Sequence, residues 1–291
     1  MPITGVVPQW LLSVVAVATV FSVMFAIGLG IVPRELRWVS ERPGLMLKAL
    51  FAVLVAVPAL AWLIARGLDL PHPAAVGLLL MAISPGAPVA LRRSLGAGGH
   101  RSFAPALQVA VAALAIVSMP MLLAAFDEYY GGSATVAPQE LVKQVFVAQL
   151  LPLSLGMFVK RLFATWAAWL EPKLARAGSA LLVLFLVMVL VDIWQDVIDA
   201  GLRVTLAIVM TTVLALGVGH VMGGPEPAAR TATAISSAAR NPGLALLVAT
   251  LNAASTAITA IVLAYFVIAA IVIIPYVIWR KRVVTSQCSD G

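Results

Sequence analysis

The sequence predicts an all-α transmembrane protein whose chain crosses the bilayer nine times. Hydrophobic residues make up 62% of its 291 residues, and charged residues only 11%. A soluble domain carries about 25% charged residues, because polar groups must cover its surface. Here apolar runs of about 20 residues, long enough to cross a bilayer as helices, alternate with short charged patches. This pattern excludes a soluble domain and indicates one compact helical bundle.

Each apolar run is interpreted as one helix. The runs lie near residues 9–32, 43–65, 73–96, 103–126, 139–160, 175–195, 200–221, 227–251 and 254–279. We therefore expect a single polytopic membrane domain over residues 1–282 and a cytoplasmic tail over 283–291. The first run has no basic flank and is too long for a signal peptide, so Met1–Val32 is expected to be an uncleaved helix.

Basic side chains gather in alternate loops. The first, third, fifth and seventh loops and the C-terminal end hold Arg34, Arg37, Arg42, Arg92, Arg93, Arg101, Lys160, Arg161, Lys173, Arg176, Arg230, Arg280, Lys281 and Arg282. The other loops hold Arg66 and Arg203, together with Asp127, Glu128, Asp196 and Asp199. Because basic loops stay in the cytoplasm, we expect the N-terminus outside and the C-terminus inside. The absence of targeting signals favours a bacterial inner membrane. Topology thus accounts for the net charge of +7, and no nucleic-acid partner is predicted.

Two of the predicted spans carry the same short motif near their middle. The third contains SPGAPVAL (84–91) and the eighth contains NPGLALL (241–247). The two spans run in opposite directions, so paired breaks favour an inverted repeat of helices 1–4 and 6–9. The break-forming residues are Pro85, Gly86, Pro88, Pro242 and Gly243.

A proline and a glycine in mid-span leave backbone groups without helical partners. Such groups are tolerated inside hydrocarbon only around a cavity or a ligand. Each half-helix that begins at a break also directs its positive dipole end to the midplane, which suits an anion. The remaining mid-span prolines, Pro58, Pro120, Pro152 and Pro275, are interpreted as packing kinks.

Arg240 directly precedes the second break. It lies ten residues beyond Arg230, about 15 Å along a helix and hence near the midplane. A charged side chain there costs at least a few kcal/mol and usually marks a pathway or ligand. It could instead snorkel to the cytoplasmic face or bond neighbouring carbonyls. Because no acidic residue lies in the centre of any span, we expect the substrate to be its partner.

The other polar candidates are weaker. Asn241 and Ser84 are expected to cap or bond the broken ends, and Gln108, Ser236 and Ser237 to line the cavity. Arg92 and Arg93, at the cytoplasmic end of their span, are interpreted as interface anchors. The three histidines are far apart and Cys288 is the only cysteine, so no metal site is predicted.

These residues resemble the bile acid:sodium symporter family. The likeness runs through FSVMFAIGLGIVPRELRWVSERPGLMLKALFAVLVAVPALAW (21–62), LDLPHPAAVGLLLMAISPGAPVALRRSL (68–95) and SSAARNPGLALLVAT (236–250). The resemblance implies a core domain, a panel domain, and two broken helices that cross at the substrate site. Many members have ten helices, so the resemblance also implies that this chain lacks the first, which leaves helix 5 unpaired.

The sodium ligands that the resemblance implies are replaced. The family's Gln in the second span falls on Val53, and a Ser-Asn pair falls on Ala90 and Leu91. A Glu and a Gln before the second break fall on Ser236 and Arg240, and two hydroxyl positions fall on Gln108 and Ala112. Sodium usually needs a carboxylate, and here a cation lies one turn away.

The sequence thus predicts a secondary transporter that moves a small organic anion across the membrane by alternating access. Its transport is expected not to be coupled to sodium through the family's usual sites. The alternative is a sodium:organic-anion symporter. No cofactor and no obligate protein partner are predicted, with sodium the one ion left open. An enzyme is not expected, because no Ser-His, Asp-Asp or His-Glu set falls inside the spans. A receptor-like bundle would be favoured if Arg240→Gln left function intact.

Overall fold

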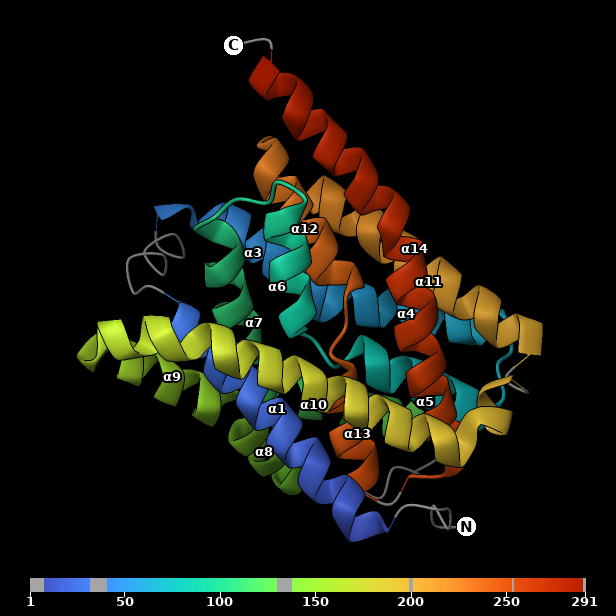
Figure 1. Ribbon diagram of the computed structural model, residues 1–291. Coiled ribbons are helices and arrows are strands. Elements are labelled where there is room, and N and C mark those ends of the chain that lie inside the picture. Colours follow the sequence, from blue (N-terminus) through green and yellow to red (C-terminus); the bar gives the residue numbers. More distant parts are fainter. Residues whose placement is uncertain (1–7, 32–40, 130–137, 199–200, 253, 290–291) are drawn as a thin grey trace.

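The computed structural model describes residues 8–31, 41–129, 138–198, 201–252 and 254–289, which are mostly helical (Figure 1). The helices are α1 (Gln9–Gly30), α3 (Pro43–Phe51), η2 (Ala52–Ala56), α4 (Val57–Gly67), α5 (His72–Ala82), α6 (Pro88–Gly96), α7 (Phe103–Tyr129), α8 (Pro138–Val145), η3 (Phe146–Leu150), α9 (Leu151–Leu162), α10 (Ala164–Ile198), α11 (Gly201–Met222), α12 (Pro227–Ala238), α13 (Pro242–Leu251) and α14 (Thr256–Ser289). No strand occurs within these ranges.

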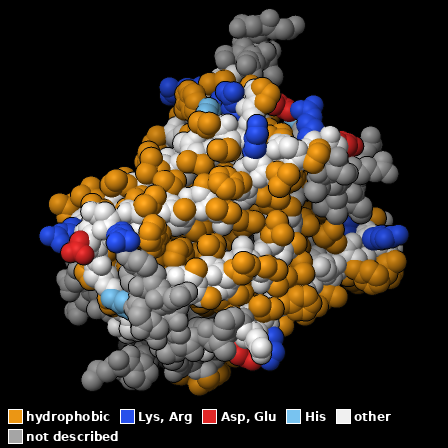
Figure 2. All heavy atoms as spheres, turned by 180° about the vertical axis from the view of Figure 1, so that it is seen from behind, with side chains coloured by type: hydrophobic (Ala, Val, Ile, Leu, Met, Phe, Trp, Pro, Cys, Tyr) orange, Lys and Arg blue, Asp and Glu red, His pale blue; other side chains and the backbone are white. Residues whose placement is uncertain are grey.

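Seven helical segments of the described chain are long and apolar enough to cross a membrane. Hydrophobic side chains cover most of one face of the molecule, while Lys and Arg lie toward its edges (Figure 2). A water-soluble protein does not expose apolar surface this continuous. The chain is therefore an integral, multi-pass membrane protein.

Two helices extend beyond their predicted ends. α10 begins at Ala164 instead of near residue 175, and it continues through Glu171, Pro172 and Lys173. The charged stretch was expected to be a loop, but a helix that emerges into water can carry charges. α14 likewise continues to Ser289, so most of the segment expected as a cytoplasmic tail, residues 283–291, is helical and extends away from the bundle (Figure 1).

Two expected single spans are each interrupted. α5 ends at Ala82 and α6 starts at Pro88, while α12 ends at Ala238 and α13 starts at Pro242. Proline begins both second halves because its missing N–H is not needed in the first helical turn, and its φ already suits a helix. The connecting backbones lie inside the bundle, with residues 83–87 and 239–241 buried.

Two π-helical turns occur inside the spans, and each is followed by a proline at the same offset. η2 precedes Val57-Pro58, and η3 precedes Leu151-Pro152. Val57 N–H bonds to Ala52 O, five residues back. The next carbonyl in that pattern, Val53 O, would need the N–H of residue 58, which a proline does not have. Pro58 therefore leaves the Val53 carbonyl free for a side-chain donor.

The helices pack in two groups. α1 lies against α9 and α10, and α4, α5, α11, α12 and α14 pack with one another. Close approach in the first group depends on glycine, since a Cβ on Gly28 would lie only 2.2 Å from Leu153 O. α10 contacts α14, and α1 contacts α13, so the two groups meet at α13 and α14.

Candidate functional site

The two interruptions touch each other in the middle of the bundle. Asn241 N–H donates to the Ser84 carbonyl at 2.9 Å, which ties the second break to the first. Ser84 Oγ donates back to Leu80 O at 2.6 Å and so caps the end of α5. Both residues are buried. Sequence positions more than 150 residues apart thus form one unit of non-helical backbone.

Asn241 caps the helix that starts at the second break. Its Oδ1 accepts from Leu244 N–H at 3.1 Å, as an N-cap side chain does. The amide nitrogen of the same side chain has no such bond. Asn241 Nδ2 is buried and has no hydrogen-bond partner among the residues that the structure describes. A buried donor left unpaired costs about 1–3 kcal/mol, so it is available to an incoming acceptor.

The first break is held by two glutamines. Gly86 adopts a positive φ of 81°. Its carbonyl accepts from Gln108 Nε2 at 2.7 Å, and the Pro85 carbonyl accepts from Gln149 Nε2 at 3.4 Å. From the sequence, Gln108 was assigned to the cavity lining and Gln149 was not predicted. A polar amide side chain inside the apolar run 139–160 could have indicated Gln149 as a candidate. Both amides satisfy backbone carbonyls that the break exposes.

Arg240 is almost fully buried, with 3% of its surface exposed. Its two terminal nitrogens donate to the Val53 carbonyl at 3.0 and 3.1 Å. The side chain therefore bonds a carbonyl instead of snorkelling, and that carbonyl is the one freed by Pro58. One carbonyl does not satisfy a guanidinium, and Arg240 Nε has no partner within the described chain.

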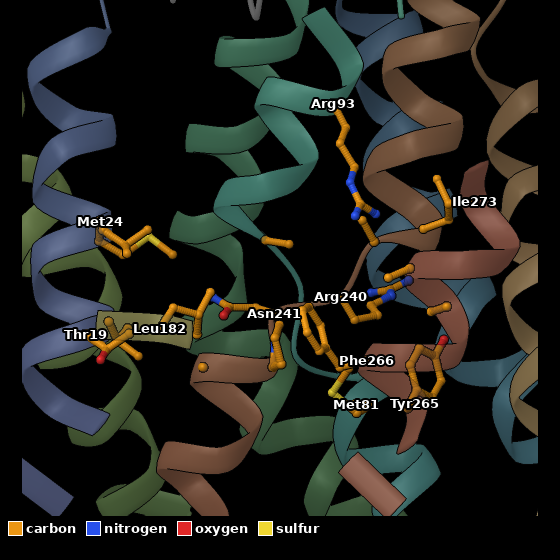
Figure 3. A pocket seen from close by; sticks show the side chains of 18 residues that line it. Thr19, Met24, Met81, Arg93, Leu182, Arg240, Asn241, Tyr265, Phe266 and Ile273 are labelled. Atoms are coloured by element: carbon orange, nitrogen blue, oxygen red, sulfur yellow. The ribbon is translucent and has the colours of Figure 1, made fainter. Parts of the chain in front are cut away.

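A small cavity adjoins these groups (Figure 3). Arg240, Asn241, Pro242 and Gly243 line it from the second break, and α1 and α14 supply the opposite walls. Those walls include Thr19, Val20, Val23, Met24, Tyr265, Phe266, Ala269, Ala270 and Ile273. Its volume of about 40 Å³ accommodates a few water molecules but no organic anion.

A second cavity of about 780 Å³ shares the lining residues Val23 and Leu182 with the first. α1, α6, α7 and α10 form its walls, and Arg92, Arg101, Glu171 and Ser179 are its polar residues. Arg92 and Arg101 belong to one of the basic loops of the sequence, so this cavity lies on the side of the bundle that carries those loops. We call it the vestibule.

The predicted site residues thus divide into three sets. Arg240, Asn241, Pro242 and Gly243 line the small cavity. Ser84, Pro85 and Gly86 form the first break, and Gln108 donates to its Gly86 carbonyl. Ser236 and Ser237 do not line the cavity, and Ser237 Oγ is directed at α11, where a Cβ on Gly219 would lie 2.7 Å from it. Pro88 starts α6, and its side chain is outside the described residues.

The assignment of Arg93 from the sequence was also wrong. Arg93 was interpreted as an interface anchor, but its side chain points from α6 into the small cavity, on the same side as Arg240 (Figure 3). Helical side chains lean toward the N-terminus of their helix, and for Arg93 that end is the first break. Thr19 of α1 was also missed, a buried hydroxyl whose Oγ1 has no partner among the described residues.

Comparison with known proteins gives the family of this chain. The sequence model of the sodium bile acid symporter family matches residues 17–201. The chain belongs to this family. The matched region contains the first break, Gln108 and Gln149, and it ends before Arg240. This family is a family of transporters.

A relative is the uncharacterised sodium-dependent transporter YocS of Bacillus subtilis (strain 168). The two sequences are 24% identical over 201 residues. The aligned part covers 69% of this chain and 60% of YocS, so the chain spans less than two thirds of that relative's length.

Proposed function

We propose that the protein is a secondary transporter that moves a small organic anion across a bacterial inner membrane by alternating access. The observation that carries the proposal is the buried guanidinium of Arg240, which lines a cavity with no acidic side chain among its described lining residues. Holding a charge at this depth costs at least a few kcal/mol, and an anionic substrate offsets that cost. Asn241 Nδ2 would donate to the same anion.

In this proposal the helices form nine spans arranged as an inverted repeat. The pairs α5–α6 and α12–α13 are the two broken spans, crossing where Asn241 bonds Ser84. The group of α1, α9 and α10 corresponds to the panel domain, and the remaining helices correspond to the core domain. With the N-terminus outside, the vestibule opens to the cytoplasm, which supports an inward-facing state.

The proposed mechanism does not place sodium at the family's usual sites. Arg240 donates to the Val53 carbonyl, so its positive charge occupies the space beside one implied ligand position. Two unit charges about 4 Å apart repel by about 4 kcal/mol at an effective dielectric constant of 20. Ser236, at the implied carboxylate position, offers no compensating negative charge. Arg240 would thus act as a tethered replacement for a bound cation.

The alternative is a sodium:organic-anion symporter, favoured by the family's name and by the description of YocS as sodium-dependent. Its ion would be held by backbone carbonyls and serine hydroxyls. Uptake into proteoliposomes separates the two proposals, with a sodium or a choline gradient and labelled organic anions. We expect equal uptake in both salts. Sodium-stimulated uptake that survives Ser236→Ala would refute the sodium-independent mechanism and support the symporter.

A further inference from the structure

We propose that Arg93 is a second anion-binding residue and that the substrate carries two negatively charged groups. Arg240 and Asn241 would hold one group at the second break, and Arg93 would hold the other group from α6. This inference rests on the proposed function, because it assigns the substrate class of the same site.

The position of Arg93 provides the first argument. It lies five residues after Pro88, about 7.5 Å along α6. Its side chain leans back toward the first break and enters the cavity that Arg240 lines (Figure 3). Neighbouring Arg92 is exposed and lines only the vestibule. A basic residue in the last turn of a helix can simply stabilise the helix dipole, but that role does not require entry into the cavity.

The charge in the cavity provides the second argument. The Arg93 side chain is partly buried and forms no hydrogen bond or ion pair with any residue that the structure describes. Among the described residues no Asp or Glu lines the small cavity, so these residues leave its two guanidinium groups uncompensated. A single carboxylate would neutralise one of them and leave the other. A dianion would neutralise both, with Asn241 Nδ2 as an additional donor.

The different anchoring of the two arginine side chains provides the third argument. Arg240 is fixed by two bonds to Val53 O, whereas Arg93 has no anchor within the described chain. The small cavity holds only a few waters, but it adjoins the 780 Å³ vestibule. Rotation of the free Arg93 side chain could enlarge the site and then close on the outer anionic group. Arg240 would fix the substrate, and Arg93 would determine which charge state is preferred.

The test compares matched ligands on the full-length protein in detergent, at a pH where carboxyl groups are ionised. Malonate, succinate and glutarate are each titrated against their monoamides, and affinity is measured from thermal stabilisation. For wild type we expect at least one dicarboxylate to bind about tenfold more tightly than its monoamide, the effect of one additional charged contact. Arg93→Gln should remove this preference and leave monoamide affinity unchanged. Arg92→Gln, the matched control, should retain it.

Each other outcome has a defined meaning. Equal affinity of wild type for dicarboxylates and monoamides, or equal weakening of both by Arg93→Gln, would overturn the role of Arg93 while leaving the anion site intact. If no anion stabilises wild type, the proposed function itself fails. If Arg93→Gln does not fold, Arg93→Lys replaces it. Lysine keeps the charge but loses the fork of donors, so a preference several-fold smaller supports the inference and an undiminished one contradicts it.

Discussion

Any side chain at position 86, in the first break, should lower the stability of the protein. Gly86 has a φ of 81°, a backbone conformation that costs an L-residue about 1–2 kcal/mol. An added Cβ would also lie 2.7 Å from Gln149 Nε2, which would displace that amide from the Pro85 carbonyl. Losing one such bond costs about 1 kcal/mol. Gly86→Ala should therefore lower the free energy of unfolding by about 2–3 kcal/mol.

A double-mutant cycle with Gln149→Ala separates the two contributions. Removing the Gln149 amide removes the contact, so Gly86→Ala in that background should cost only the backbone strain, about 1–2 kcal/mol. The assay is equilibrium unfolding of purified protein in a denaturing detergent. Gly217→Ala is the control, because a Cβ at Gly217 would meet nothing within 4 Å and alanine favours a helix. A cost below about 0.5 kcal/mol for Gly86→Ala, or strict additivity in the cycle, would refute the argument.

Two further predictions concern the second break and the packing of α1. Asn241→Ala should lower stability by about 1 kcal/mol through loss of the cap, whereas Asn241→Asp should keep the cap but abolish anion binding by repulsion. Equal binding by Asn241→Asp and wild type would contradict this. Gly28→Ala should cost about 1–3 kcal/mol because its Cβ would overlap Leu153 O, and unchanged thermal stability would show that α1 and α9 are not so close.

The interruptions could be predicted from the sequence because proline and glycine change the conformation of the backbone at their own positions. Pro88 and Pro242 begin helices in the structure, and Asn241 is the N-cap of the second. The sequence pattern also placed Arg240 at the break. Its carbonyl partner, Val53, could not be foreseen, because that contact depends on a π-turn 187 residues earlier in the chain.

Other features depended on tertiary contacts. Gln149 lies on a span with no motif, and only the fold brings it to the Pro85 carbonyl. Arg93 was assigned to the interface from its distance along the helix, but the direction of a side chain around the helix decides which surface it meets. Pro58 was interpreted as a kink, whereas with the π-turn before it the residue frees the carbonyl that Arg240 uses.

The most direct test of the central claim is thermal stabilisation of the purified protein by organic anions, in sodium and in choline, for wild type, Arg240→Gln and the exposed-site control Arg203→Gln. A ligand that binds only the folded state raises stability with the logarithm of its saturation. The account predicts a carboxylate that stabilises wild type and Arg203→Gln equally in both salts and fails with Arg240→Gln. Stabilisation that requires sodium, or that persists in Arg240→Gln, would contradict it.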